Sequence, residues 1–259
     1  MKLKVECPAK INLTLKIFEK DDITGFHPIE SIMQTVSLFD YLTVETNSSN
    51  KVELSGNSNE ITYNKNNLIL KACSLFFKKA KIKNKGLKIY TEKNIPVAAG
   101  LAGGSTDAAG MIYALNYIYK NALSETDIFE INSILGSDIN FCYKGGRALA
   151  KGKGDNLKSL PFKPFNLMII KPINLKISTK EAYLAFDNLK EKSNLPNDLE
   201  FALIPLYKEL KELQSMGFQM SGSGPSFFVV NPEIKINFDN KKYQIFENLK
   251  AVNHGVKFV

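Results

Sequence analysis

The alternation of apolar and polar residues predicts several strands in the first half of the chain. Apolar side chains recur at every second position over 3–7 and again over 11–17, with Pro8 interrupting the run. Further strands are predicted at 41–45 and 51–55, on either side of a short polar turn. The first half is therefore expected to be rich in strands.

Apolar residues spaced three and four apart predict helices after these strands. The helices are expected at 67–80, 105–119 and 126–135, with Ser105 capping the second. The elements predicted for the second half are a strand at 166–170, a helix that contains 179–189, a helix that ends near Met216, a strand at 226–230, a helical stretch at 243–249 and a final strand at 255–259.

The order of these elements favours an α+β fold. Strands and helices do not alternate strictly, as they would in a parallel doubly wound sheet. Residues 151–164 are rich in Gly, Lys, Asp, Asn and Pro, which is the composition of a connecting segment. We therefore predict two domains, at 1–155 and 156–259.

The composition is that of a globular protein with a sizeable core. Of the 259 residues, 44% are apolar and 10% are aromatic. Every apolar run falls short of the roughly 18 residues that span a bilayer, and residues 1–7 lack the apolar core of a signal peptide. We therefore expect no membrane segment and a cytoplasmic location.

Cysteine and histidine are too few for a disulfide framework or a multi-histidine metal site. The three cysteines, Cys7, Cys73 and Cys142, are widely separated, which indicates reduced thiols. His27 and His254 are the only histidines in the chain. The sequence therefore predicts neither a disulfide bond nor a zinc site.

The net charge of +8 raises the question of a nucleic-acid partner. The positive residues are scattered, and the densest group, at 78–85, lies where a predicted helix ends. Lysines at that position interact favourably with the helix dipole and stay solvated. We therefore expect a solvated face and no nucleic acid, although a basic surface would also attract a substrate that carries several phosphates.

The glycine-rich segment at 96–106 joins a flexible loop to the start of a helix. Gly100, Gly103 and Gly104 allow the backbone to curl so that successive N–H groups point inward, at the positive end of the helix. An anion such as phosphate is the expected occupant, and the alternative is a tight turn without a ligand. The sequence contains neither a Walker-type nor a dinucleotide-binding glycine motif.

This loop resembles the second motif of the superfamily of galactokinase, homoserine kinase, mevalonate kinase and phosphomevalonate kinase. Four other segments match that superfamily in the right order, at 8–13, 25–27, 136–138 and 220–225. Within it, the chain resembles the kinases of the non-mevalonate isoprenoid route. The resemblance implies ATP and Mg²⁺ as cofactors, and a small-molecule substrate that bears a cytidine diphosphate.

The resemblance also implies the fold of each domain. The N-terminal domain, which would bind ATP and substrate, is expected to be similar to the second domain of ribosomal protein S5. The C-terminal domain is expected to be ferredoxin-like. The sequence leaves the oligomeric state open between a monomer and a homodimer.

Two residues are expected to carry the chemistry. Phosphoryl transfer to an alcohol needs a carboxylate that orients the hydroxyl and accepts its proton. The resemblance assigns this role to Asp138, which on its own would be a cap or turn residue. Lys10 would lie beside it, keep it ionised and offset phosphoryl charge, with Asn12 on the same strand face holding substrate. The alternative for Lys10 and Asn12 is a solvent-facing pair.

The cytidine is expected to bind at Phe26 and His27. The resemblance implies that the Phe26 ring stacks on cytosine and that His27 hydrogen-bonds the edge of the base. Thr179 and Tyr183 are predicted to contribute to the same pocket, with Tyr183 closing its other side. The alternative for Phe26 is packing in the core.

The resemblance assigns the rest of the site to ATP. Asn67, Leu68 and Lys93 match positions around adenine, although Asn67 is equally suited to cap a helix. Ser105 or Thr106 could offer a hydroxyl to magnesium, and the turn at 221–224 is expected to support the loop. The predicted cradle comprises Pro96, Val97, Ala98, Ala99, Gly100, Leu101, Ala102, Gly103, Gly104, Ser105 and Thr106, with Ala102 replacing the glycine usual at its position.

Two other functions are considered beside this one. The first is another small-molecule kinase of the same superfamily, such as a homoserine or mevalonate kinase. The second is a non-catalytic RNA-binding module, which the basic charge and the expected S5-like domain would favour. Clustered aromatics on a basic strand surface would support RNA binding, and the sequence shows no such cluster.

Overall fold

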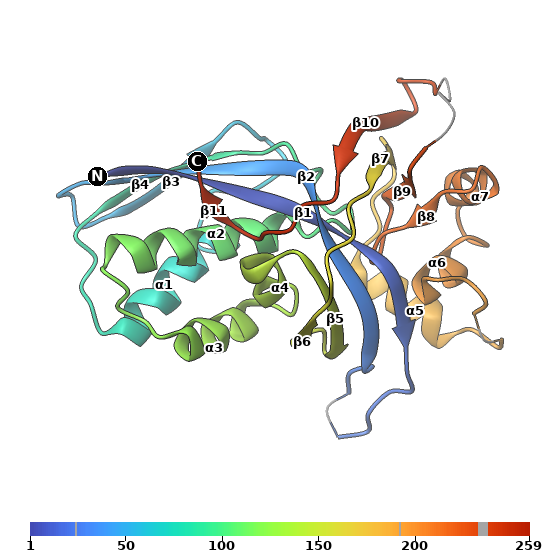
Figure 1. Cartoon of the computed structure of the whole chain (residues 1–259), viewed down its shortest axis with the longest axis horizontal. Coiled ribbons are helices and arrows are strands. Elements are labelled where there is room, and N and C mark those ends of the chain that lie inside the picture. Colours follow the sequence, from blue (N-terminus) through green and yellow to red (C-terminus); the bar gives the residue numbers. More distant parts are fainter. Residues whose placement is uncertain (24, 192, 233–237) are drawn as a thin grey trace.

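The computed structural model describes residues 1–23, 25–191, 193–232 and 238–259. It is an α+β structure with two β-sheets, and helices α1 to α4 lie against the first sheet (Figure 1). The first sheet runs in the order β11-β1-β2-β4-β3, with β5 pairing β2 and β6 pairing β5. Its strands are β1 (Lys2–Ile17), β2 (Ile29–Thr46), β3 (Val52–Gly56), β4 (Leu87–Glu92), β5 (Arg147–Gly152), β6 (Asn156–Ser159) and β11 (Lys257–Phe258).

Strand β1 is continuous where the sequence predicts an interruption. The strand runs through Pro8, and the pairing of β1 with β2 shifts register between Pro8 and Ala9. A bulge of this kind accommodates proline because proline has no N–H to donate to the ladder. The prediction that Pro8 divides the strand was therefore wrong.

Strand β3 does not pair with the strand that precedes it. It pairs in parallel with β4, and β4 pairs antiparallel with β2, so β4 lies between the two predicted neighbours. Parallel strands need a long crossover, and α1 (Leu68–Ala80) supplies it. The buried side chains of Leu87 and Ile89 favour this central place for β4.

The first core lies between this sheet and helices α1, α2 (Gly103–Ile118), α3 (Glu125–Leu135) and α4 (Ile139–Lys144). Helix α2 is buried over most of its surface, since it packs against β1 on one side and other helices on the other. Gly110 permits this approach, because a Cβ there would lie 2.5 Å from the sulfur of Cys7. The predicted helices at 67–80 and 126–135 are confirmed within one residue at each start.

The second sheet has the order β10-β7-β9-β8 and is antiparallel throughout. Its core is closed by three short helices (Figure 1). The elements are β7 (Asn166–Pro172), α5 (Thr179–Asp187), α6 (Asp198–Leu203), α7 (Lys208–Ser215), β8 (Gln219–Met220), β9 (Phe227–Val230) and β10 (Tyr243–Lys250).

The helix predicted at 243–249 is wrong, because this segment forms strand β10. It pairs with β7 in a register that places Ile245 opposite Ile170 and Phe246 opposite Ile169. A short segment with apolar residues at mixed spacing fits either period. Here pairing with an apolar strand decides its structure.

Strand β1 joins the two halves of the molecule. Val5 and Cys7 belong to the first core, Ala9 and Ile11 to a cluster between the sheets, and Leu15 to the second core. The predicted boundary at residue 155 stays a prediction. β6 and β11, which follow it in sequence, pair within the first sheet.

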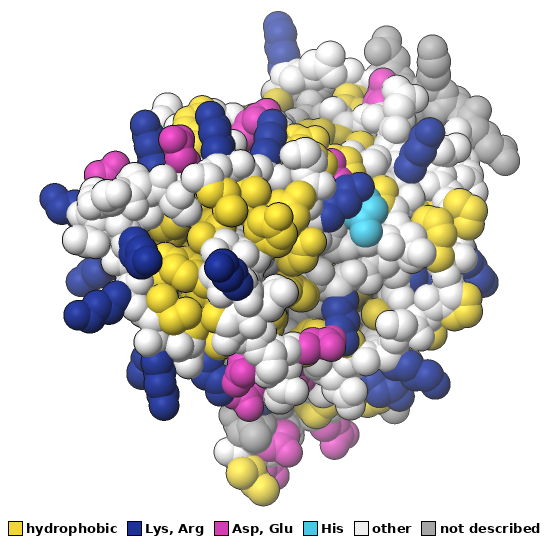
Figure 2. Space-filling model, turned by 60° about the vertical axis from the view of Figure 1, so that its left-hand side comes forward, with side chains coloured by type: hydrophobic (Ala, Val, Ile, Leu, Met, Phe, Trp, Pro, Cys, Tyr) yellow, Lys and Arg dark blue, Asp and Glu magenta, His cyan; other side chains and the backbone are white. Residues whose placement is uncertain are grey.

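Charge and surface agree with the sequence analysis on the face that Figure 2 shows. Lys and Arg side chains are spread over this face, with apolar, acidic and uncharged side chains between them. Within the described part of the chain, no helix is long and apolar enough to cross a membrane.

A buried acid links α6 to β8. Glu200 is 2% exposed, and one of its carboxylate oxygens accepts a hydrogen bond of 2.9 Å from the Met220 amide. Burial raises the pKa of this carboxyl from 4.5 to about 7, an effect that the Met220 hydrogen bond opposes. The folded state therefore holds a proton that the unfolded chain releases between these two pH values.

We predict that Glu200→Gln weakens the dependence of stability on pH. A folded-state pKa above the unfolded value means that stability falls as pH rises from 4.5 to about 7. The amide stays neutral and can still accept from Met220, so the variant should be more stable than the parent at pH 8 by about 2–3 kcal/mol. Urea unfolding at pH 5 and pH 8 measures this, and parallel pH profiles for the two proteins would contradict it.

Candidate active site

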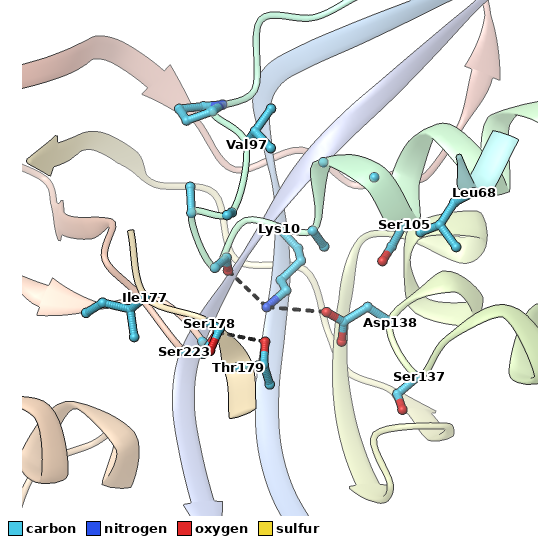
Figure 3. Close-up of a pocket in the computed structure, with 18 of the residues that line it drawn as sticks. Lys10, Leu68, Val97, Ser105, Ser137, Asp138, Ile177, Ser178, Thr179 and Ser223 are labelled. Atoms are coloured by element: carbon cyan, nitrogen blue, oxygen red, sulfur yellow. Dashed lines mark hydrogen bonds and ion pairs between the residues drawn. The ribbon is translucent and has the colours of Figure 1, made fainter. Parts of the chain in front are cut away.

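A cavity of about 730 Å³ lies where the two halves of the molecule meet. It is lined by side chains from β1, from the loop before α2 and from the turn after β8 (Figure 3). Leu68, Gly103 and Thr179, the first residues of α1, α2 and α5, also line it. Three helix N-termini therefore converge on one cavity, and their positive ends favour an anionic ligand.

Lys10 lies in the wall of this cavity, beside Asp138 (Figure 3). It is 4% exposed, and its ammonium donates to Asn12 Oδ1 at 2.6 Å and to the Gly100 carbonyl at 3.1 Å. The same nitrogen is 3.7 Å from Asp138 Oδ2. The solvent-facing alternative for Lys10 and Asn12 is therefore wrong, because both side chains are buried.

Asp138 stands at the start of α4, where the sequence reads as a cap. Its side chain makes no capping hydrogen bond and is 31% exposed, whereas the Lys10 side chain is 5% exposed. The Asp138 carboxylate is therefore more accessible from the cavity than the Lys10 ammonium is. An opposite charge at this distance stabilises the carboxylate, and the exposed oxygens can accept a proton from a bound hydroxyl.

The glycine-rich loop forms one wall of the cavity. Residues 96–100 and 102–105 line it, whereas Leu101 is buried in the cluster between the sheets. Gly100 has a φ of 73° and packs against the turn after β8, where a Cβ would lie 2.2 Å from the Ser221 carbonyl oxygen. Only glycine therefore fits at this position.

Helix α2 begins at Gly103, two residues before the predicted start. The N-cap is Ala102, which has a φ of 58° and offers no capping side chain, so the prediction that Ser105 caps the helix was wrong. Left-handed backbone costs a residue with a Cβ roughly 1 kcal/mol, so the methyl group of Ala102 strains the backbone slightly. The first residues of α2 line the cavity, and no side chain caps their amides, which leaves these amides available to an anion.

The two hydroxyls predicted for magnesium lie in different surroundings. Ser105 lines the cavity, whereas Thr106 is fully buried and does not. Among the described residues, no group of three or more His, Cys, Asp or Glu could hold a metal ion. Any magnesium here would therefore be held mainly by phosphate oxygens and water, which is how this ion usually binds with nucleotides.

The residues predicted around adenine come from the start of α1 and from the segment just before the glycine-rich loop. Asn67, Leu68 and Lys93 all line the cavity. Asn67 caps α1, because its Oδ1 accepts from the Ile69 amide at 2.9 Å and its Nδ2 donates to the Thr62 carbonyl at 2.8 Å. Its side chain is thus occupied as a cap, the alternative that the sequence leaves open.

The ammonium of Lys93 is held by two buried carboxylates. It is hydrogen-bonded to Asp40 and lies 2.7 Å from Asp107 Oδ2, and all three side chains are at most 5% exposed. Asp40 also accepts from the amides of Asn94 and Ile95 at 2.6 and 2.8 Å. Burial, opposed by Lys93 and reinforced by Asp40, raises the pKa of the Asp107 carboxyl to about 7. This cluster ties the loop to β2 and α2.

A second cavity of about 410 Å³ opens beside the first. Phe26, His27, Thr179 and Tyr183 all line it, as the sequence predicts for one pocket. Phe26 is 57% exposed, so the core alternative is wrong, and the Lys153 ammonium lies 4.3 Å from the centre of its ring.

His27 is held in place by two oxygen atoms. Its Nδ1 lies 2.8 Å from the Phe18 carbonyl oxygen, and its Nε2 lies 2.8 Å from Asp187 Oδ1. Its ring centre is 5.8 Å from that of Tyr183. His27 and Tyr183 therefore line the second cavity side by side, with both imidazole nitrogens engaged by the protein.

The sequence analysis missed several residues of the site. Lys153 and Asp187 line the second cavity, and neither lies in a segment that resembles a motif. Asp40 could have been found, because it falls in phase with Leu38, Leu42 and Val44 on the buried face of β2. A charged residue in the apolar phase of a strand indicates a buried partner.

Comparison with known proteins agrees with this geometry. The pattern described as GHMP kinases N terminal domain matches residues 67–146. A crystal structure of homoserine kinase from Cytophaga hutchinsonii superposes with a TM-score of 0.73 at 16% identity, covering 100% of this chain and 97% of that one. Residues 67–146 therefore carry the pattern of the GHMP kinases, and the chain as a whole has the fold of this homoserine kinase.

More similar proteins narrow the class. A 4-diphosphocytidyl-2-C-methyl-D-erythritol kinase from Caldanaerobacter subterraneus is 35% identical over 97% of this chain and 94% of its own length. One from Caldicellulosiruptor bescii is 37% identical over 87% and 88%. A crystal structure of 4-(cytidine 5'-diphospho)-2C-methyl-D-erythritol kinase has a TM-score of 0.79 at 29% identity, covering 98% of this chain and 100% of that one. The chain belongs to the 4-diphosphocytidyl-2-C-methyl-D-erythritol kinase family, which decides against the RNA-binding alternative.

We predict that Lys93→Met destabilises the fold strongly. The change leaves two buried carboxylates without their cation, which typically costs about 3–5 kcal/mol. The loss should be largest at pH 8 and smaller at pH 5, because the Asp107 carboxyl, whose pKa is about 7, is then protonated. Urea unfolding measures it, with Lys88→Met, an exposed lysine on β4, as the control. Equal losses in the two variants would contradict the role of the cluster.

Proposed function

We propose that the chain transfers the γ-phosphoryl group of ATP to the 2-hydroxyl of 4-diphosphocytidyl-2-C-methyl-D-erythritol. The observation that carries this proposal is the position of Lys10 and Asp138 in the larger cavity, beside the smaller one. The two cavities share Ile29, Ser137, Lys153, Thr179 and Tyr183, so they are continuous. The larger cavity can hold the triphosphate, and the smaller cavity can hold the cytidine.

The charged groups where the two cavities meet explain how the transfer would proceed. Asp138 orients the substrate hydroxyl and takes up its proton while the oxygen bonds to the γ-phosphorus and the bond to the ADP oxygen breaks. Lys10 stabilises the carboxylate and offsets charge on the transferring group. The amides of residues 103–105 and the α2 dipole hold the phosphates.

Magnesium fits this donor set, with Ser105 as the residue that would hold it. Bound with ATP, the ion would neutralise charge on the phosphate oxygens. Ser105 offers a hydroxyl at the start of α2 and Asp138 a carboxylate in the same cavity, and the described residues contain no dedicated carboxylate cage. This suits an ion that arrives with its nucleotide.

The cytidine site is proposed around Phe26, His27 and Tyr183. An exposed aromatic ring beside a cavity supplies a stacking face. His27 lines the same cavity, and because both of its ring nitrogens lie against protein oxygens, a hydrogen bond to the base would require one of these contacts to be exchanged. Lys153 lies between this site and the junction, since it lines both cavities. Its charge suits the diphosphate of the substrate.

The finer description of the fold belongs to the same proposal. The antiparallel order β10-β7-β9-β8 with helices against it supports a ferredoxin-like C-terminal domain at 156–259. An S5-like N-terminal domain at 1–155 is expected from the resemblance. The cytoplasmic location and a monomeric or homodimeric state stay predictions from the sequence.

We predict that ATP consumption by the purified protein depends on the cytidine-bearing substrate and not on homoserine, mevalonate or RNA. Asp138→Asn should fold normally and lose roughly 10²–10⁴-fold in kcat, because the amide cannot accept the proton. A coupled ADP assay measures both. Turnover of homoserine or mevalonate at the same rate would assign a different substrate, and a parental kcat in Asp138→Asn would exclude this aspartate as the base.

We predict that Phe26→Ala weakens binding of the cytidine substrate alone. Losing a stacking face costs about 1–3 kcal/mol, roughly a 5- to 150-fold rise in KM. KM for ATP should stay near the parental value, and Phe26→Tyr should behave like the parent because it keeps the ring. The variant should fold, since Phe26 is 57% exposed. Parental KM values for both substrates would place the cytidine elsewhere.

A further inference from the structure

The turn at 220–224 touches the centre of the site. Ser221 Oγ donates to the Gly100 carbonyl at 3.0 Å, the same oxygen that accepts from the Lys10 ammonium. The Asn12 amide donates to Ser221 Oγ at 3.3 Å. A Cβ added at Gly222 would lie 3.1 Å from the Lys10 ammonium nitrogen. The position of this turn therefore sets where the ammonium and the loop carbonyl can lie.

Asn197 holds this turn from behind. The residue is fully buried, and its Nδ2 donates to the carbonyls of Met220 and Gly222, each at 2.9 Å. Its Oδ1 accepts from the amides of Leu199 and Glu200 at 3.0 and 3.4 Å. A side-chain amide has two donor hydrogens and an oxygen that can accept twice, and these four contacts use all of them. The amide therefore links α6 to the turn.

The start of α6 is in turn tied to the strand that carries Lys10. The Leu15 amide donates to the Pro196 carbonyl at 2.8 Å, and Leu15 forms a bridge with Asn197. The Met220 amide donates to Glu200, so the turn has a second attachment to the same helix. Each of three elements near Lys10 is therefore hydrogen-bonded to the other two: strand β1, the N-terminus of α6 and the turn.

A helix cap alone does not require asparagine at this position. Ser124 and Ser178 cap α3 and α5 with a hydroxyl that accepts from a helix amide, and the Ser124 hydroxyl donates only within its own helix, to Asp127. Asn197 does the same with Oδ1 and adds two donors aimed at the turn. Asn197 does not line the cavity, so it acts on the site through other residues.

We propose that Asn197 is a positioning residue for phosphoryl transfer. Its amide fixes the turn at 220–224, and through that turn it fixes the Gly100 carbonyl and the Lys10 ammonium beside Asp138. The proposal rests on the proposed function, because its readout is the phosphorylation of the cytidine substrate. It assigns no contact with either substrate to Asn197.

The test distinguishes the two roles of the Asn197 side chain, capping α6 through Oδ1 and donating to the turn through Nδ2. Asn197→Ser keeps an acceptor for the helix amides and removes both bonds to the turn. We expect kcat to fall by about 10- to 100-fold, since a small misplacement of catalytic groups costs this much. KM for the cytidine substrate should stay near the parental value, because Phe26 and His27 are untouched. Steady-state kinetics and thermal unfolding are measured together.

Asn116→Ser is the matched control. Asn116 is also buried, and its side chain also bridges backbone groups, at Leu123, where it donates at 3.3 Å and accepts at 3.0 Å. It does not line the cavity. This variant should lose stability and keep the parental kcat. A parental kcat in Asn197→Ser, with a stability loss like that of the control, would overturn the proposal.

A second set of variants keeps the test decisive. If Asn197→Ser fails to fold, Asn197→Asp has the same size, keeps the acceptor and turns a carboxylate oxygen toward the two carbonyls, so it should show the same fall in kcat. Ser221→Ala removes the bond to Gly100, and its effect should not multiply with that of the Asn197 variant if both act through the turn. Independent, multiplying losses would overturn the proposal. An inactive parent would contradict the proposed function, whereas an active parent with an unaffected Asn197 variant contradicts only the positioning role.

Discussion

The burial of the Lys10 ammonium is the constraint on which the rest of the site depends. A charge that is 4% exposed is stable only with oxygen partners around it. Here they come from three separate parts of the chain, Asn12 on β1, the Gly100 carbonyl and Asp138 at the start of α4. Folding must bring these parts together to satisfy one cation, and in doing so it assembles a carboxylate beside a phosphate-binding loop.

Strand β1 is suited to carry this lysine because it passes through both cores. Its first part packs under α2, and its last part packs against α6 in the second core. A side chain on such a strand is fixed from both sides. At the other end of the loop, the Lys93 ammonium is held between Asp40 and Asp107. The segment at 96–105 is therefore anchored at Gly100 by one buried ammonium, and the residues that flank it are held by the cluster around the other.

The residues that line the larger cavity could be predicted better than those that support them. Lys10, Asp138 and the glycine-rich loop lie in short segments that resemble motifs of a known kinase superfamily, and all three line that cavity. Asp107, Asn197 and Glu200 support them through buried side chains, and of these three only Asp107 lines the larger cavity. Each contacts its partner across many residues of sequence, as Asn197 does with Met220 and Gly222. No local pattern records such a contact, so the sequence could not indicate it.

By itself, the sequence determined what local interactions decide. The caps at Asn67 and Gly136 place the start of α1 and the end of α3, because a cap acts on amides within one turn of itself. Tertiary structure decided what depends on distant partners. Segment 243–249 became a strand because β7 was available to pair with it, and β4 separated two strands that are neighbours in sequence. Thr106 faces the core and Ser105 the cavity, although both are adjacent hydroxyls, because packing of α2 on β1 sets which face of the helix is buried. Such choices follow from the burial of whole surfaces, which is a property of the assembled fold and not of any segment within it.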